Sequence, residues 1–353
     1  MTNYKNETLG LTISYLNIEG VHSKILGCKI PHIEKYLNSD IEILAESWGS
    51  CKHDKGLKDY HLIEVKPQKL KDIKKGRKSG GLLIYFKNFL LNHIKMIKQA
   101  ENYVWLQIKK SFLKTLNKDL FLCIAYNPPE DSPYHKSDLF DNLSNDIIDM
   151  VSETSSFFIM GDLNARTGNL HDYEITDKNN LSSKYNLSTN PKTLRRNCDS
   201  KTNNQGEKII DLCKKFDLML LNGRTYGDFW GNFTHYNMNG GASTIDLALS
   251  SCSIFKNVNN FMVNPQSEIS SHCRITAEIE HVFSNSAERK EKIDYEWLDE
   301  PKNSFCWEES SKNSFMEALD LDMVKTLINE ANQFIDAGLI ESYNNSRNFS
   351  KSR

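Results

Sequence analysis

The stretch Ser155–Leu170, "SSFFIMGDLNARTGNL", joins a short apolar run directly to polar side chains. Phe157–Met160 has the length and composition of a buried strand. The run is followed by Gly161, and the next positions include Asp162 and Asn164. A charged or amide group placed against a core loses its hydration and needs a compensating partner. The stretch therefore predicts a strand that ends at a site where polar groups from elsewhere in the chain meet it.

Similar polar positions end or interrupt other apolar runs. "LNIEG" ends an N-terminal run with Asn17 and Glu19, and "LAESW" ends the next run with Glu46. "STIDLALSS" holds Asp246 inside an apolar run, where a turn or a cap explains a carboxylate least well. Carboxylate and amide oxygens suit a hard cation such as Mg²⁺, Mn²⁺ or Ca²⁺, whereas zinc prefers nitrogen and sulfur. Together these residues predict a divalent-cation site.

A histidine precedes the last run of the set. In "SEISSHCRITAEI", Ser271 and His272 come before alternating apolar and polar residues, which predict a strand. A single histidine in this position is more often structural than catalytic. Because it follows the acidic positions along the chain, it also lies where a group that polarises a phosphate would be useful.

The composition allows a large folded core. Of 353 residues, 39% are hydrophobic and 25% are charged, and the net charge of -2 neither requires nor excludes a nucleic-acid partner. The eight cysteines form no CxxC pair, which predicts reduced thiols. The N-terminus has no secretory signal, and no apolar run reaches the roughly 18 residues of a membrane span. We expect an intracellular protein of the nucleus or cytoplasm, neither secreted nor membrane-bound.

Short apolar runs rich in β-branched and aromatic residues recur through the first 280 residues and predict strands. The predicted strands are 11–18, 41–48, 80–86, 103–108, 120–126, 157–164, 217–223 and 243–251. Helical spacing of apolar residues predicts helices over 23–37, 137–151 and 204–217. Many strands with few helices predict packed sheets with helices on their outer faces.

The composition changes near residue 282. Residues 1–281 form the predicted main domain, 282–310 are charged and poor in apolar residues, and 311–353 begin with helical spacing and end in a polar tail. We therefore expect a linker over 282–310 and a C-terminal helical segment with a frayed tail over 311–353.

A basic segment, "KPQKLKDIKKGRKSGG", runs from Lys66 to Gly81 and holds seven Lys or Arg against one Asp. It is either a solvated loop or a surface that contacts a phosphate backbone, in which case binding would depend on salt. The phosphate-binding interpretation names its central cations, Lys74, Lys75, Arg77 and Lys78.

Six motifs, "LNIEG", "AESW", "AYNPPE", "GDLNAR", "STIDLALSS" and "SSHCRI", resemble in this order those of the endonuclease/exonuclease/phosphatase superfamily, which includes DNase-I-like and abasic-site endonucleases. The resemblance covers residues 9–281, and residues 222–251 are most similar to endonuclease domains of LINE-type retrotransposons. It implies a four-layer α/β sandwich of two mainly antiparallel sheets flanked by helices, here with a C-terminal helical extension. Since no Asp-Asp polymerase motif is present, we expect an endonuclease piece or a truncated reading frame.

The resemblance also implies roles for individual residues. It gives metal binding to Glu46, metal and phosphate binding to Asn17 and Glu19, orientation or deprotonation of the attacking water to Asp162, phosphate contacts to Tyr126 and Asn164, and the final acid–histidine pair to Asp246 and His272. These types fit the chemistry, because a cation neutralises charge when an anionic nucleophile attacks an anionic phosphorus. A general base contributes typically about 10²- to 10⁴-fold.

One position departs from the family, which ends in Ser-Asp-His. Here Ser270 and Ser271 precede His272, so a neutral hydroxyl stands where a carboxylate is expected. A serine is a weaker hydrogen-bond partner than a carboxylate. If His272 depends on that carboxylate, activity is attenuated, unless Asp246 pairs with the histidine instead.

The leading hypothesis is a Mg²⁺-dependent endonuclease domain of a LINE-like retrotransposon, which nicks DNA. Mn²⁺ is expected to substitute for Mg²⁺, and no small-molecule cofactor or membrane partner is expected. One alternative is a phosphatase or phosphodiesterase of the same superfamily acting on a small phosphorylated substrate. Another is a catalytically silent DNA-binding domain. The basic segment and the LINE-like residues favour DNA, while the oligomeric state stays open.

Overall fold

The computed structural model describes residues 9–23, 26–34, 36–49, 56–68, 78–113, 115–151, 156–173, 195–237, 239–281 and 325. The chain separates into two units, residues 1–288 and 289–353, and every described residue except Lys325 lies in the first unit. The predicted linker, most of the predicted C-terminal helical segment, and Lys74, Lys75 and Arg77 lie outside the described residues. The domain boundaries therefore stay predictions.

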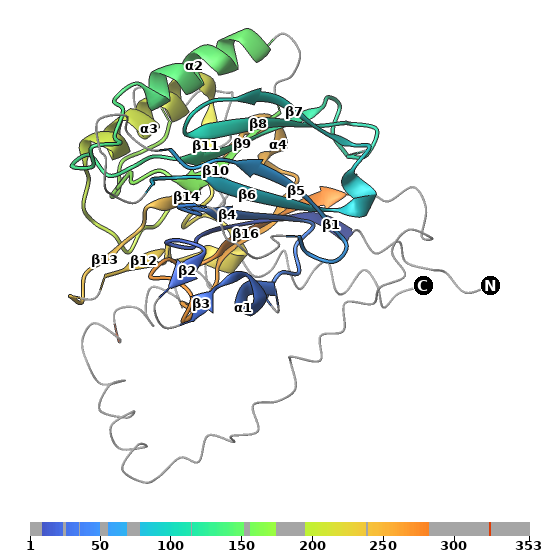
Figure 1. Ribbon diagram of the computed structural model, residues 1–353. Helices are drawn as coiled ribbons and strands as arrows, with labels where there is room; N and C mark the ends of the chain where they lie inside the picture. The colour runs from blue at the N-terminus through green and yellow to red at the C-terminus, as the bar shows by residue number, and fades with distance from the viewer. Residues whose placement is uncertain are drawn as a thin grey trace, which may run out of the picture. The chain divides into compact units, whose positions relative to one another are not determined.

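Two six-stranded sheets form the first unit (Figure 1). In spatial order the first sheet contains β15 (Val258–Val263), β16 (Ile275–His281), β1 (Leu9–Asn17), β4 (Ile41–Ala45), β6 (Leu82–Lys87) and β5 (Tyr60–Val65). The second contains β11 (Leu218–Leu220), β14 (Asp246–Ser251), β10 (Phe157–Asp162), β9 (Leu120–Tyr126), β8 (Tyr103–Ile108) and β7 (Ile94–Gln99).

The remaining elements are short, apart from two helices. They are α1 (Ile30–Glu34), α2 (Leu139–Met150), α3 (Asn204–Phe216), α4 (Cys252–Phe255), the 3₁₀ turns η1 (Asn88–Leu90) and η3 (Tyr226–Asp228), and the hairpins β2 (His22–Ser23) with β3 (Gly27–Cys28) and β12 (His235–Tyr236) with β13 (Ala242–Ser243).

Alternation along the strands sorts apolar side chains into three layers of core. In β1, Ile13 and Tyr15 belong to the cluster between the two sheets, whereas Leu16 belongs to the cluster shared with α1. The outer face of the second sheet packs against α2 and α3, which lie together above it in Figure 1. The result is a helix–sheet–sheet–helix sandwich, so the predicted four-layer fold is confirmed.

Each sheet is antiparallel except for one central parallel pair, β1 with β4 and β9 with β10. Parallel neighbours require a crossover connection, and the crossovers contain α1 in the first sheet and α2 in the second. Both strands of a parallel pair end at the same edge. This topology brings the residues at the ends of β1 and β4 close to those at the ends of β9 and β10.

The sequence predictions differ from the structure at several elements. The predicted helix 23–37 is wrong over its first part, where β2 and β3 form a hairpin and Gly27 has a φ of 65°. Helix α1 begins only at Ile30, and Pro31 in its first turn cannot donate to an earlier turn. Strands β5, β7 and β15 were missed because they mix polar residues with apolar ones and carry exposed positions.

Candidate active site

An asparagine links the two sheets at the edge where the parallel strands end. Asn17, the last residue of β1, donates from Nδ2 to Glu46 Oε1 at 3.0 Å and to Asp162 Oδ2 at 2.9 Å. Glu46 follows β4, and Asp162 ends β10. All three residues are buried. A single amide thus holds one carboxylate from each sheet in a fixed relation.

The backbone at this edge is unusual. Glu19, Glu46, Trp48 and Asn164 have φ values of 48°, 54°, 55° and 48°, and they make up four of the six non-glycine residues with positive φ in the described part of the chain. Such conformations cost about 1–3 kcal/mol each and cluster at functional sites. Side chains support two of them, because Asn17 Oδ1 accepts from the backbone of Glu19 at 3.0 Å and Asp162 Oδ1 from that of Asn164 at 3.1 Å.

Gly161 allows β10 to approach β9 closely. A Cβ atom at this position would lie 2.0 Å from the carbonyl oxygen of Ala125. The same pairing places Asp162 opposite Tyr126. Burial, followed by the charges of Glu46 and Asp162, raises the pKa of Tyr126, which also hydrogen-bonds to Glu46. The tyrosine hydroxyl is therefore a neutral donor facing the carboxylates.

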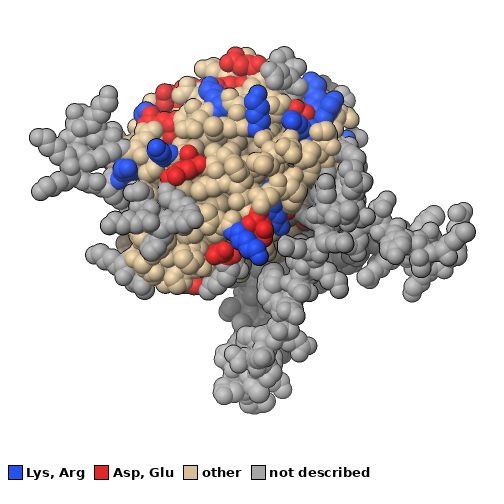
Figure 2. Space-filling view, turned by 45° about the vertical axis from the view of Figure 1, so that its right-hand side comes forward, with Lys and Arg blue, Asp and Glu red and all other residues tan. Residues whose placement is uncertain are grey.

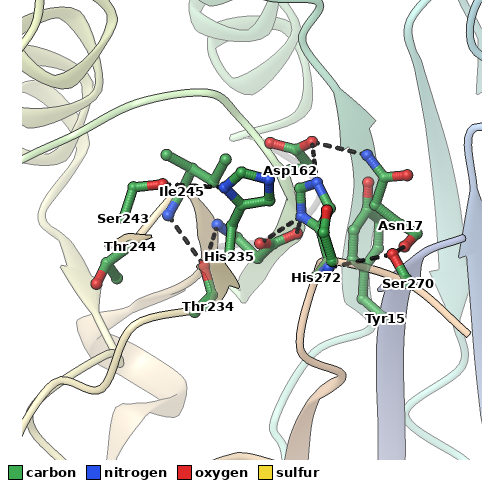
Figure 3. A network of polar contacts seen from close by, with 12 residues as sticks. Tyr15, Asn17, Asp162, Thr234, His235, Ser243, Thr244, Ile245, Ser270 and His272 are labelled. Carbon is green, nitrogen blue, oxygen red and sulfur yellow. Dashed lines mark hydrogen bonds and ion pairs between the residues drawn. The ribbon is translucent and has the colours of Figure 1, made fainter. Parts of the chain in front are cut away.

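An acid–histidine pair completes the cluster (Figure 3). Asp246, the first residue of β14, lies opposite Asp162 in the sheet. His272 Nδ1 lies 2.9 and 3.1 Å from the two carboxylate oxygens of Asp246, and its Nε2 lies 4.0 Å from Asp162 Oδ2. Thr234 Oγ1 accepts from the backbone nitrogens of Ile245 and Asp246, at 3.0 Å each, and so fixes the start of β14.

Burial and charge strongly perturb the titration of this cluster. Burial first, and then the charge of Asp246, raises the pKa of Asp162. Burial alone would lower the pKa of His272, but the charge and hydrogen bond of Asp246, with the charge of Asp162, raise it to about 10. The metal-free cluster therefore contains an imidazolium at neutral pH and an acid that binds its proton unusually well.

The donor set fits a hard divalent cation. Ligand atoms of Asp162, Asp246 and His272 lie within 4.8 Å of one another. Glu46 adds a further carboxylate that is joined to Asp162 through Asn17. Because Nδ1 of His272 is occupied by Asp246, the carboxylate of Glu46 is a better donor for such a cation than the imidazole. The cluster holds several buried carboxyl groups and only one imidazolium, so a bound cation would reduce the repulsion among the carboxylates.

Ser271 contacts Glu19 rather than the histidine ring. Glu19 Oε2 accepts from Ser271 N at 2.8 Å and from Ser270 Oγ at 3.1 Å, while Oε1 accepts from Ser271 Oγ at 2.9 Å. Burial would raise the pKa of Glu19, but these hydrogen bonds and the charge of His272 together lower it. Glu19 is thus held as a carboxylate by the two serines, and its backbone nitrogen is joined to Asn17 Oδ1.

Two other predicted site residues, Asn164 and Lys78, lie on segments next to this cluster. Asn164 is half-buried and its Nδ2 donates to the carbonyl oxygen of Asn127 at 2.8 Å. Lys78 is exposed, two residues before Gly80, whose carbonyl accepts from Trp48 N at 3.1 Å. The C-terminal end of the basic segment therefore adjoins the loop that carries Glu46.

Sequence reasoning missed three contributors. Trp48 Nε1 donates to Glu46 Oε2 at 2.5 Å, and Thr234 positions Asp246 as described. His235 packs against His272 with ring centroids 4.5 Å apart, and burial and the charge of His272 lower its pKa. The only sequence signal for Thr234 and His235 is their place in "NFTHYN", between an aromatic run and the β14 motif, and it does not identify their partners.

No protein-family model matches the sequence, and no curated protein sequence matches it. Solved structures do match. The 3′-5′ exonuclease NExo from Neisseria meningitidis has a TM-score of 0.51 at 13% identity over 76% of this chain and 99% of that chain. The same Neisseria enzyme, named as a 3′ phosphatase bound to product DNA hairpin, gives 0.50 at 13% identity with the same coverage.

Two further solved structures are similar to the chain. AP endonuclease LMAP from Leishmania major gives a TM-score of 0.57 at 11% identity over 79% of this chain and 90% of that chain. The endonuclease domain of TRAS1, a telomere-specific non-LTR retrotransposon, gives 0.46 at 12% identity over 78% and 100%. The likeness to the NExo and LMAP structures confirms the predicted fold: the chain has the DNase-I-like endonuclease/exonuclease/phosphatase fold.

Proposed function

We propose that this protein is a Mg²⁺-dependent endonuclease that nicks DNA by hydrolysing a phosphodiester bond. The convergence of Glu46, Asp162, Asp246 and His272 from four separate segments carries the proposal. The similar structures support it, because they are named as nucleases and a phosphatase. One of these structures is bound to a DNA hairpin.

The cation would be held by the carboxylate of Glu46, beside that of Asp162. When bound, it neutralises charge on the phosphate and polarises the P–O bond. Asn17 fixes the spacing of the two carboxylates, and Trp48 orients Glu46 through the hydrogen bond to Oε2. Mn²⁺ takes the same oxygen ligands and is expected to substitute for Mg²⁺.

The remaining roles follow from protonation. Asp162 is the proton acceptor for the attacking water in this scheme, because burial and the charge of Asp246 raise its affinity for a proton, while a cation on Glu46 would keep it ionised. His272 is a cationic donor to a phosphoryl oxygen, and Asp246 fixes its orientation through Nδ1. Tyr126 and Asn164 are further phosphate contacts in this scheme.

The Ser271 departure acts on Glu19 in this proposal. Sequence reasoning predicts attenuation if His272 lacks a carboxylate partner, but Asp246 provides one at 2.9 Å. Ser271 instead donates twice to Glu19. We therefore expect His272 to keep its role. Attenuation stays a prediction, which a comparison of nicking by the natural protein and by Ser271→Asp tests directly.

DNA is the proposed substrate because of cations close to the site, and not because of a positive electrostatic potential over a whole face of the protein. On the face shown in Figure 2, basic and acidic side chains of the described residues are interspersed. Lys78 adjoins the Glu46 loop and continues into the basic segment. The retrotransposon type and the intracellular location stay predictions, and none of the described helices is long and apolar enough to cross a membrane.

A plasmid-nicking assay tests the proposal. Supercoiled DNA is incubated with the protein and Mg²⁺, with EDTA replacing Mg²⁺ in the control, and the Glu46→Ala and Asp162→Ala variants are run beside it. We expect Mg²⁺-dependent nicking that both variants abolish. Release of phosphate from an inositol phosphate without nicking would favour the small-substrate alternative. DNA binding without cleavage of either substrate would favour the silent DNA-binding domain.

A further inference from the structure

Two adjacent aromatic side chains stand exposed on the loop that follows η3. Phe229 and Trp230 are 44% and 51% exposed, and their rings are T-shaped with centroids 5.3 Å apart. The guanidinium carbon of Arg196 lies 4.6 Å from the Phe229 centroid and 4.5 Å from the Trp230 centroid. We call these three residues the aromatic platform. Arginine and tryptophan are over-represented among residues that dominate binding energy.

The platform is rigidly supported. Asp228, which is 1% exposed, accepts from Gly223 N at 3.0 Å and from both the backbone and side-chain nitrogens of Asn232 at 2.8 Å. Arg196 N donates to the Gly223 carbonyl at 2.9 Å. The exposure of Phe229 and Trp230 is therefore built into a hydrogen-bonded loop, and binding by these rings loses little conformational entropy.

A series of contacts links the platform to the candidate active site. Cys198 N donates to the Gly231 carbonyl at 2.9 Å, and Cys198 Sγ donates to the Trp230 carbonyl at 3.4 Å. Cys198 also lines a cavity of about 470 Å³ whose lining includes Asn164 and His235. His235 in turn packs on His272. These contacts form a path of adjoining residues from the acid–histidine pair, through the cavity lining, to the platform.

The chemistry along this path suits a nucleotide strand. Arg166 also lines the cavity, but its guanidinium is paired with Asp199, so Lys201 is the cation there without a described carboxylate partner. At the platform, a guanidinium lies beside half-exposed aromatic rings. A nucleotide combines a planar base with an anionic phosphate, so its base can stack on a ring while its phosphate pairs with Arg196.

We propose that the aromatic platform binds an unpaired nucleobase of the DNA strand that flanks the scissile phosphate. This inference rests on the proposed function and specifies its substrate, which is DNA with a single-stranded segment beside the cleaved bond. The base stacks on Trp230, and Arg196 contacts the adjoining phosphate. The cavity between Cys198 and His235 accommodates the intervening nucleotide.

Fluorescence anisotropy in EDTA tests this without cleavage. The probes are a fluorescein-labelled DNA hairpin with a fully paired stem and the same hairpin with an unpaired extension of about six nucleotides at the 5′ or the 3′ end. We expect tighter binding of one extended probe by the natural protein. Trp230→Ala should weaken that probe about 5- to 150-fold and leave the blunt hairpin unchanged. Trp230→Tyr should retain most of the affinity.

Two further variants sharpen the test. Arg196→Gln should flatten the salt dependence of binding to the extended probe by about 0.7 in log K per log salt, as for one lost phosphate contact on a single strand. Trp230→Ala should leave that slope unchanged. Ile148→Ala, which removes a side chain that is 49% exposed on α2, is the matched control and should change neither probe. Thermal melts check that each variant is folded.

The outcomes separate the two proposals. The inference is overturned if neither extension improves binding, if Trp230→Ala binds the extended probe like the natural protein, or if it weakens both probes equally. If Trp230→Ala loses extension-specific binding but the natural protein never nicks DNA with Mg²⁺, the base-binding site stands and the proposed hydrolysis fails.

Discussion

Asp246→Asn is the substitution that most directly examines the candidate site. Asp246 is fully buried and contacts His272 Nδ1 through both carboxylate oxygens, at 2.9 and 3.1 Å. Asparagine preserves the shape but removes the charge and one acceptor. The change therefore separates the electrostatic contribution of Asp246 from its packing in β14.

The expected magnitude follows from the competing influences on His272. Burial is the largest influence on its pKa and lowers it, and Asp246 is the largest that raises it to about 10. Without the Asp246 charge, we expect the pKa of His272 to fall toward or below 6.5. Breaking a buried ion pair costs about 3–5 kcal/mol of stability. The cost should lie at the low end, because the substitution also relieves repulsion between Asp246 and Asp162.

Turnover should fall further than stability. In a serine-protease triad, replacing the aspartate that orients the histidine lowers turnover by about 10⁴-fold. We expect a loss of about 10³- to 10⁴-fold in nicking by Asp246→Asn, since the neutral His272 becomes a weaker donor and loses its orientation. In the natural protein the ion pair of Asp246 with His272 contributes fully to stability below pH about 6.5, the ordinary pKa of histidine. This contribution is lost as the pH rises through about 10, the raised pKa of His272 in the folded protein. The variant should lack that alkaline loss.

The assay combines NMR titration of the histidine side chains in EDTA, plasmid nicking in Mg²⁺, and thermal melts across pH. His272→Gln assigns the resonance. Ser250→Ala is the matched control, because Ser250 is buried in the same strand and its hydroxyl has no hydrogen-bond partner. An unchanged His272 pKa in Asp246→Asn, with the protein folded, would refute the reasoning. So would a nicking rate within about threefold of the natural rate, set against the expected 10³-fold.

Three further predictions follow from other contacts. Mg²⁺ at 100 times its Kd should stabilise the natural protein by about 2.7 kcal/mol and so raise its Tm. Glu46→Gln should abolish this rise in Tm, and an undiminished rise would place the cation elsewhere. Ser271→Asp puts a carboxylate against Glu19, whose Oε1 lies 2.9 Å from Ser271 Oγ, so the Tm in EDTA should fall below that of the natural protein. An equal or higher Tm in EDTA would contradict this. Asp172→Asn should cost about 3–5 kcal/mol, because Asp172 and Arg224 form a buried two-bond pair at 2.6 and 2.7 Å. Burial would raise the pKa of Asp172, but Arg224 lowers it, so this contribution is present above pH about 4 and is lost as pH falls through the lowered pKa; urea melts that show no such acid dependence would exclude the pair as a stabilising element.

The pattern of apolar residues in the sequence was sufficient to predict the central strands of the two sheets, but not the strands at the sheet edges. Strands β9 and β10 are buried along their whole length, so apolar residues dominate their sequences. Edge strand β7 exposes most of its residues, including Lys95 and Lys98, and its sequence resembles that of a loop. The hairpin of β2 and β3 depends on Gly27 and on contacts distant in sequence, which a helical spacing of apolar residues cannot reveal.

The acids of the site were predictable because an uncompensated carboxylate in an apolar run is costly. Asp162 and Asp246 carry that signal in their own neighbours. Thr234, His235 and Trp48 carry no such signal, since a threonine, a half-buried histidine and a tryptophan are ordinary in strands and loops. Their importance depends on which backbone amide, ring or carboxylate lies beside them, and this is fixed only by the folded chain.

The location of the site follows from one topological feature. A parallel pair forces both of its strands to end at one edge, where backbone groups lose their ladder partners and side chains must replace them. Asn17 and Asp162 end the two pairs and meet across the sandwich at 2.9 Å. Tyr15, two residues before Asn17, donates from its hydroxyl to the Ala125 carbonyl in β9 at 3.2 Å and holds the sheets in register. Tyr15→Phe removes only that hydrogen bond. The free energy of unfolding should fall by roughly 1 kcal/mol. If the register of the sheets depends on this hydrogen bond, the loss in nicking rate, expressed as an activation free energy, should be larger than that. Equal losses in the two free energies would show that packing alone aligns the sheets.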